Sequence, residues 1–221
     1  MLNLVVTIDE ILWWVATALN FLFALLLWPR VIKAKKANVP SYMNYFLGVV
    51  LFFIIHGTCR VFYLMYDYYF TDPTTDVWLW NVGAILGVAS ITVLIFFIEN
   101  IIIKKTHHFF TIFGIVGIVV FIVGSNIPAI LIYGQSVFVT TLALIVPLFY
   151  LVFAYQTTGS VRNNSILMFF GILIFEISQV AHSEAAWKMF PDLKPLFQLL
   201  GAIFMLAGLA IIYVSVSRSE V

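Results

Sequence analysis

The chain has 221 residues, of which 63% are hydrophobic and 10% are charged, whereas about 25% of the residues of an ordinary soluble domain are charged. A water-soluble core of this size cannot enclose so much apolar surface. The formal net charge is +1, and the chain lacks the long runs of Lys and Arg that track a phosphate backbone, which excludes nucleic acid as an expected partner. We expect a multi-pass protein of the cell membrane, with the lipid bilayer as its partner.

Apolar runs separated by polar, Pro- or Gly-containing breaks predict an all-α, polytopic bundle of seven transmembrane helices that forms one domain over residues 1–221. A membrane-spanning helix needs about 20 apolar residues, which this length accommodates. The expected spans lie near 10–30, 42–68, 77–103, 108–126, 134–156, 162–188 and 194–217. The weakest break is the segment 124–135, which has turn residues but no charge and leaves a re-entrant or merged segment as an alternative.

The distribution of Lys and Arg predicts the orientation, because cytoplasmic loops retain positive charge. Basic residues that flank the expected spans fall on one side of the membrane: Arg30, Lys33, Lys35, Lys36, Lys104, Lys105, Arg162 and Arg218. The opposite side holds mostly acidic residues: Asp9, Glu10, Asp67, Asp72, Asp76, Glu184 and Asp192, with Lys188 and Lys194 among them. We therefore expect the N-terminus outside and the C-terminus in the cytoplasm.

Two ionisable side chains inside the expected spans require an explanation, because a charge at the helix centre costs about 2.5–3.5 kcal/mol. Arg60 lies in the outer part of the second span, and Glu176 lies about 20 Å into the sixth span from its cytoplasmic end. His56, Arg60 and Tyr63 follow a spacing of i, i+4, i+7, which places them on one helical face. Glu176 and Gln179 share a face of the sixth span, with His182 beside it.

These two polar stripes predict an outward-facing pocket between the second and sixth helices, since neither stripe faces lipid cheaply. Asn20 on the first span is a further candidate for its wall. The expected ligand-binding residues are His56, Arg60, Tyr63, Asn81, Glu176, Gln179, His182 and Gln198. In the alternative interpretation, Arg60 extends to the outer interface, and the other polar groups bond one another between helices.

Cofactor and enzyme signals are weak. His56 and His182 are the two histidines inside the expected spans, so a haem held between them is a third and weaker hypothesis. No metal site is predicted, because the carboxylates are not at ligand spacing. No Gly-x-Ser-x-Gly, His-Glu-x-x-His or phosphate-binding glycine motif occurs, so no enzymatic reaction is predicted. Cys59 lies inside the second span and is interpreted as a small core residue.

Small residues suggest close helix packing and a weak internal repeat. Gly83 and Gly87 form a Gly-x-x-x-Gly motif, which favours close helix approach. Gly83-Ala84-Ile85 is similar to Gly201-Ala202-Ile203, and Phe46-Leu47-Gly48 is loosely similar to Phe170-Gly171. These matches suggest that the first three and the last three spans are parallel repeats joined by the fourth, an arrangement found in some transporters.

The expected topology resembles that of rhodopsin-like receptors, stand-alone prokaryotic seven-helix sensors and small sugar transporters, at the level of topology alone. A retinal linked to lysine is not expected, because Leu200–Ala207 in the last span contains no lysine. The first hypothesis is a sensor or receptor-like protein that binds a small molecule in the outer pocket and signals through a cytoplasmic partner. The alternative is a small secondary transporter with Glu176 as its coupling carboxylate.

Overall fold

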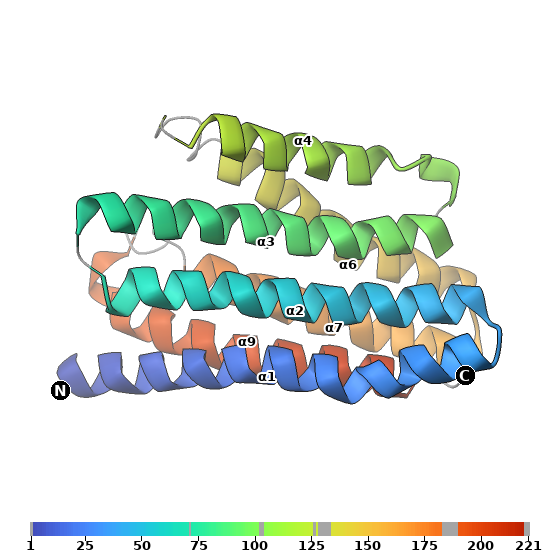
Figure 1. The fold of residues 1–221 in the computed structure, drawn as a ribbon. Helices are drawn as coiled ribbons and strands as arrows, with labels where there is room; N and C mark the ends of the chain where they lie inside the picture. The colour runs from blue at the N-terminus through green and yellow to red at the C-terminus, as the bar shows by residue number, and fades with distance from the viewer. Residues whose placement is uncertain are drawn as a thin grey trace. The chain divides into compact units, whose positions relative to one another are not determined.

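The structure is a computed structural model that describes residues 2–70, 72–101, 104–125, 127, 134–182 and 190–218. All regular structure in these ranges is helical (Figure 1). The elements in chain order are α1 (Leu2–Lys36), α2 (Pro40–Tyr68), α3 (Pro73–Ile101), the 3₁₀ turn η1 (Lys104–Thr106), α4 (Phe109–Val123), the π-helical turn η2 (Gln135–Val139), α6 (Thr140–Gln156), α7 (Gly159–Ala181), the 3₁₀ turn η3 (Pro191–Leu193) and α9 (Lys194–Ser217).

The helices confirm a multi-pass membrane protein. Within the described ranges, six helices are long and apolar enough to cross a bilayer, and α4 is shorter, with 15 residues. An α-helix of that length extends about 22 Å, whereas the hydrocarbon core is about 30 Å thick. The count of seven crossings and the orientation therefore stay predictions. Most of the uncertain segment 124–135 lies outside the described residues.

Helix boundaries follow from local sequence chemistry. Pro40 begins α2, where the missing N–H of proline costs nothing and its fixed φ suits the first helical turn. The last turn of α1 carries Lys33, Lys35 and Lys36, whose charges favour the carbonyl end of a helix. Asn38 follows with φ at 54°, and asparagine is among the side chains that tolerate this left-handed conformation.

The helices form two compact units. The central unit comprises residues 20–149, and the terminal unit comprises residues 1–19 together with 150–220. Two helices, α1 and α6, each contribute residues to both units.

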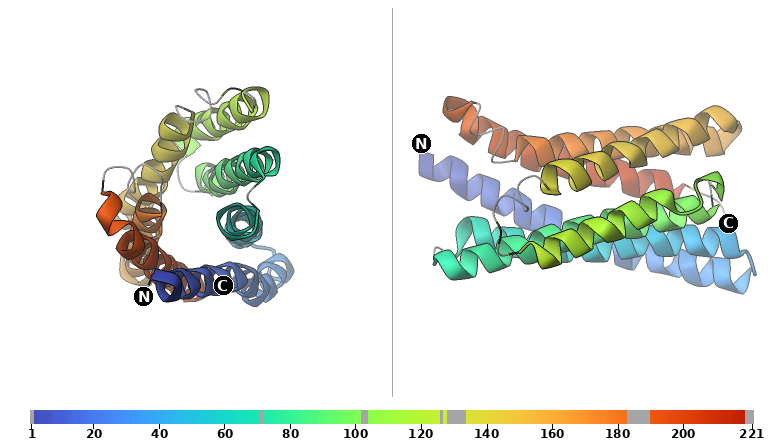
Figure 2. Two further views of the ribbon diagram at one scale, coloured as in Figure 1. Left: turned by 90° about the vertical axis from the view of Figure 1, so that its left-hand side faces the viewer. Right: turned by 90° about the horizontal axis from the view of Figure 1, so that it is seen from above.

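Within the central unit, α2, α3 and α4 lie side by side in that order (Figures 1 and 2). A Cβ atom at Gly83 of α3 would lie 3.0 Å from Cε1 of Tyr63 on α2. The Cys59 thiol of α2 donates a hydrogen bond to the Gly83 carbonyl, with a sulfur–oxygen distance of 3.1 Å. These contacts confirm that the Gly-x-x-x-Gly motif serves close helix approach and that Cys59 is a buried core residue.

Within the terminal unit, α7 and α9 pack backbone against backbone. A Cβ atom at Gly208 of α9 would lie 2.7 Å from the backbone nitrogen of Phe175 and 2.9 Å from the carbonyl oxygen of Gly171. The Ser215 hydroxyl donates a hydrogen bond to the carbonyl of Asn164 at 2.6 Å. Association of helices in lipid depends on such close packing and interhelical hydrogen bonds, because the hydrocarbon tails are as apolar as the side chains.

The two glycines that the repeat hypothesis pairs have a similar packing role. Gly83 lies against Tyr63 of α2, and a Cβ atom at Gly201 of α9 would lie 3.2 Å from the Ser178 carbonyl oxygen of α7. Each glycine thus brings one helix close to the neighbouring helix of its own unit. The repeat itself stays a hypothesis.

We expect Gly208→Ala to destabilise the protein by about 1–3 kcal/mol, because the added methyl group meets backbone atoms that have no rotamer by which to move away. Thermal unfolding of the purified protein in detergent measures the effect. The control is Ala210→Val, at an exposed position of the same helix. An unchanged unfolding midpoint for Gly208→Ala would contradict the backbone contact.

Candidate functional site

The polar face of α2 belongs to the central unit. Because α2 is a continuous helix over this segment, His56, Arg60 and Tyr63 lie along one face of it. The Arg60 guanidinium carbon is 5.5 Å from the centre of the Tyr63 ring. The buried His56 ring stacks on Phe52, with ring centres 5.6 Å apart and planes inclined by 17°.

Arg60 is held inside the protein. Its side chain is 2% exposed, which argues against the alternative in which it extends to the outer interface. The guanidinium is charged at every accessible pH, so burial has to be compensated by its surroundings. Tyr63 supplies one part of that compensation, since a cation over an aromatic face contributes about 0.5–2 kcal/mol. This charge is the most distinctive chemical feature of the α2 face.

Asn81 also belongs to the central unit, and it has a structural role that was not predicted. Its side-chain nitrogen donates a hydrogen bond to the carbonyl of Ser125 at 3.0 Å. Ser125 is in the turn that follows α4, so the amide attaches the end of α4 to α3. The Asn81 side-chain oxygen accepts no hydrogen bond from the described residues. A role for Asn81 in ligand binding stays a prediction.

The remaining predicted residues belong to the terminal unit. Glu176 and Gln179 are on α7, and Gln198 is on α9; all three are partly exposed. The Glu176 carboxylate has no hydrogen bond or ion pair with any described residue. His182 follows the last residue of α7, and its ring packs on that of the fully buried Trp13, with centres 4.5 Å apart.

The eight predicted ligand-binding residues are thus divided equally between the two units. His56, Arg60, Tyr63 and Asn81 belong to the central unit, and Glu176, Gln179, His182 and Gln198 belong to the terminal unit. The pocket expected between the second and sixth helices stays a prediction. Residues 183–188, the end of the expected sixth span, lie outside the described residues.

The haem hypothesis gains no support from the two histidines. Both rings already pack on aromatic rings, His56 on Phe52 and His182 on Trp13. Among the described residues, no group of three or more His, Cys, Asp or Glu side chains is placed to hold a metal ion.

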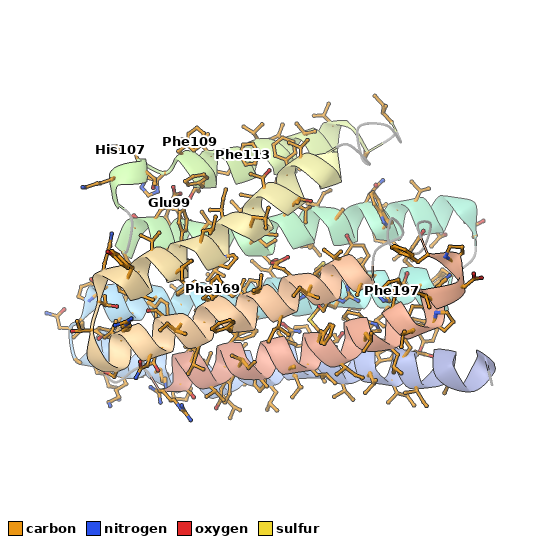
Figure 3. The ribbon with its side chains drawn as sticks, turned by 180° about the vertical axis from the view of Figure 1, so that it is seen from behind. Glu99, His107, Phe109, Phe113, Phe169 and Phe197 are labelled. Atoms are coloured by element: carbon orange, nitrogen blue, oxygen red, sulfur yellow. The ribbon has the colours of Figure 1, made fainter. Side chains whose placement is uncertain are left out.

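Glu99 of α3 is a buried carboxylate that accepts several hydrogen bonds from another helix, and it was not predicted as a functional residue. It is 1% exposed and lies close to the first turn of α4, beside Phe109 and His107 (Figure 3). Its oxygens accept hydrogen bonds from the backbone N–H of Phe110 at 3.2 Å and of Thr111 at 2.9 Å, and from the Thr111 hydroxyl at 2.5 Å. Glu99 therefore caps a helix to which it does not belong.

This cap explains how α4 begins. The first N–H groups of a helix have no partner within it, and they carry a partial positive charge that favours an anion. The residue at the cap position, His108, has a left-handed backbone with φ at 63° and makes no capping hydrogen bond with its side chain. Glu99 supplies the acceptors instead. Usual sequence signatures of a cap are local to the helix, so the sequence around residue 109 does not reveal one supplied by α3.

Three contacts set the antiparallel register of α3 and α4. Asn81 contacts Ser125 near the predicted outer end, and Glu99 contacts Thr111 near the predicted cytoplasmic end. Between them, a Cβ atom at Gly114 would overlap the Thr92 side chain. The α3–α4 pair is therefore attached at both ends and packed without space in the middle.

No protein-family model, no curated protein and no solved structure matches the chain.

We expect Gly114→Ala to destabilise the protein by about 1–3 kcal/mol, because the new methyl group overlaps the Thr92 side chain. Thr92→Ala opens that space, so the double variant Gly114→Ala with Thr92→Ala should recover most of the loss. Thermal unfolding of the four proteins forms a double-mutant cycle. Additive effects of the two substitutions would contradict the contact.

Proposed function

We propose that the chain is a membrane sensor that binds a small molecule at the polar face of α2, formed by His56, Arg60 and Tyr63. A contribution of Glu176, Gln179 and His182 to ligand binding stays a prediction. The single observation that carries it is the buried guanidinium of Arg60, placed over Tyr63 inside an apolar helix. A charge in a membrane helix is energetically unfavourable. A bound ligand of opposite charge would offset this unfavourable free energy.

The side chains of this face indicate the ligand's chemistry. Arg60 offers five N–H donors in a planar arrangement that matches the two oxygens of a carboxylate. His56 adds a ring nitrogen one helical turn away, and Tyr63 adds an aromatic face and a hydroxyl group. A compact carboxylate is therefore the ligand class that this face fits best.

The burial of Arg60 favours a sensor. At 2% exposure, the guanidinium is reached by a ligand only after the surrounding helices shift. Binding is then coupled to helix movement, and a ligand that prefers the shifted arrangement increases its population. The shift in helix arrangement is then transmitted to a cytoplasmic partner in this proposal.

A thermal-shift experiment tests ligand binding. Purified protein in detergent is heated with small mono- and dicarboxylates, and with the corresponding amides as uncharged controls. A carboxylate at about 100 times its Kd should stabilise the wild type by about 2.7 kcal/mol. Arg60→Gln should remove this stabilisation, whereas Arg162→Gln, the same substitution at an exposed position of α7, should retain it. The proposal fails if no carboxylate stabilises the wild type more than its amide does, or if Arg60→Gln responds equally.

One observation favours a second candidate function, a small secondary transporter. Glu176 lies inside α7 and is partly exposed, and no described residue forms a hydrogen bond or ion pair with its carboxylate. Carboxylates inside membrane helices commonly carry protons or coupling ions in transporters.

Uptake into proteoliposomes distinguishes the two functions. A transporter should accumulate a stabilising carboxylate under an imposed pH gradient, and Glu176→Gln should abolish the accumulation while the protein still folds. Glu10→Gln, which removes a carboxylate near the start of the first span, is the matched control. Binding without flux would support the sensor and rule out the transporter for that ligand.

A further inference from the structure

The last turns of α1 carry exposed apolar and basic side chains on one side of the helix. Leu25, Ile32 and Lys36 are seven and four residues apart, a spacing that places them in one row. Trp28 and Lys35, also seven residues apart, form the adjacent row. All five side chains are exposed and belong to the central unit. Together these five residues form the α1 face.

The order of side chains along the α1 face matches the order of groups in a phospholipid. Leu25 is apolar, and Trp28 is the residue type that gathers at the membrane–water interface. Lys36 follows eight residues later, about 12 Å along the helix axis. Because Cα–Cβ bonds in a helix tilt toward its N-terminus, the lysine side chain extends back toward the interface. An acyl chain, a glycerol group and a phosphate succeed one another in the same direction.

Contacts with α2 hold the α1 face in place. The Arg30 guanidinium carbon lies 5.9 Å from the centre of the Phe46 ring of α2, which is within the range of a cation–π contact. Phe46 is fully buried. The turn between the helices is closed by a backbone hydrogen bond from the Val39 N–H to the Ala34 carbonyl at 3.1 Å. The end of α1 is therefore ordered before any lipid binds, which lowers the entropy cost of binding.

The charge in this part of the chain has one sign. No acidic residue occurs between Glu10 and Asp67. Asp72 and Asp76, at the start of α3, follow the opposite end of α2. Glu99, near the end of α3, is buried and accepts hydrogen bonds from α4. The sequence around the α1 face thus supplies basic groups without adjoining carboxylates, and an anion from outside the chain is its electrostatic complement.

We infer that the α1 face binds an anionic phospholipid. The acyl chain lies along Leu25 and Ile32, and the phosphate lies near Lys35 and Lys36. Lysine provides a compact charge with three N–H donors for phosphate oxygens. A cluster of basic residues directly after a membrane helix is typical of binding to anionic lipids. This inference uses residues other than the polar face of α2, so it stands or falls independently of the proposed function.

Quenching of Trp28 fluorescence by brominated lipids tests the inference. The purified full chain is placed in phosphatidylcholine vesicles that contain a small, equal fraction of brominated phosphatidylglycerol or of brominated phosphatidylcholine. Bromine on the acyl chain quenches indole rings that it contacts, and subtraction of the Trp28→Phe signal isolates Trp28. Brominated phosphatidylglycerol should quench Trp28 more strongly than brominated phosphatidylcholine does. Both leaflets contain the lipid, so the result does not depend on the orientation of the chain.

Matched variants identify the side chains responsible. Each of Lys35→Gln and Lys36→Gln should lower the relative affinity for phosphatidylglycerol about fivefold, because one basic residue near an anionic surface contributes about 1 kcal/mol. Lys35→Arg with Lys36→Arg keeps the charge and should retain the preference. Lys105→Gln, at an exposed position after α3, makes the same change in charge and should also retain it.

Two further controls separate lipid binding from other roles of these lysines. Their charges also favour the carbonyl end of α1, but this contribution is independent of the lipid headgroup and appears as a change in thermal unfolding in phosphatidylcholine alone. If the double glutamine variant does not fold, the single variants provide the test. Inorganic phosphate, compared with chloride at equal ionic strength, should not displace the lipid, because it has no acyl chain.

Four results would overturn the inference. The first is equal quenching of wild-type Trp28 by the two brominated lipids. The second is an unchanged preference in Lys35→Gln and Lys36→Gln. The third is an equal loss in Lys105→Gln, which would assign the preference to the overall charge of the protein. The fourth is displacement by inorganic phosphate, which would assign the site to a free anion.

Discussion

The requirement that every backbone N–H and C=O be hydrogen-bonded inside the protein governs this structure. Hydrocarbon offers no partner to a backbone polar group, so the chain forms helices. Helix ends are then the difficult places, because their outermost groups have no partner in the helix. Glu99 of α3 accepts hydrogen bonds from the first N–H groups of α4 and so provides the partners that they lack within the helix. The same requirement explains why Asn81 meets the Ser125 carbonyl at the opposite end.

The lipid environment also determines how the helices pack against one another. Because lipid does not drive apolar helices together, close contact has to come from small residues and interhelical hydrogen bonds. Gly83 with Cys59 in the central unit, and Gly208 with the α7 backbone in the terminal unit, show both means. The buried Arg60 differs from these groups because it carries a full charge inside a membrane helix, and this charge makes it a candidate for binding.

The sequence predicted the helices well and the polar contacts poorly. The expected span 42–68 corresponds to α2 (Pro40–Tyr68), and 194–217 coincides with the range of α9, because hydropathy and proline both act locally. Glu99 was overlooked because its partners are in another helix, 11 and 12 residues away along the chain. The hydrogen bond from the Asn81 amide to the end of α4 was also not predicted, since polarity alone does not identify a partner. A pocket made by distant helices depends on tertiary arrangement, which local patterns do not encode.

The shortness of α4 has a consequence for the surrounding membrane. A helix of about 22 Å is shorter than a hydrocarbon layer of about 30 Å, and a bilayer adapts to a short helix embedded in it by thinning locally or by drawing polar groups inward. Water and headgroups would then approach the ends of α4 more closely than those of its longer neighbours. Membrane thickness would thereby determine how closely water approaches the carboxylate of Glu99, which caps α4.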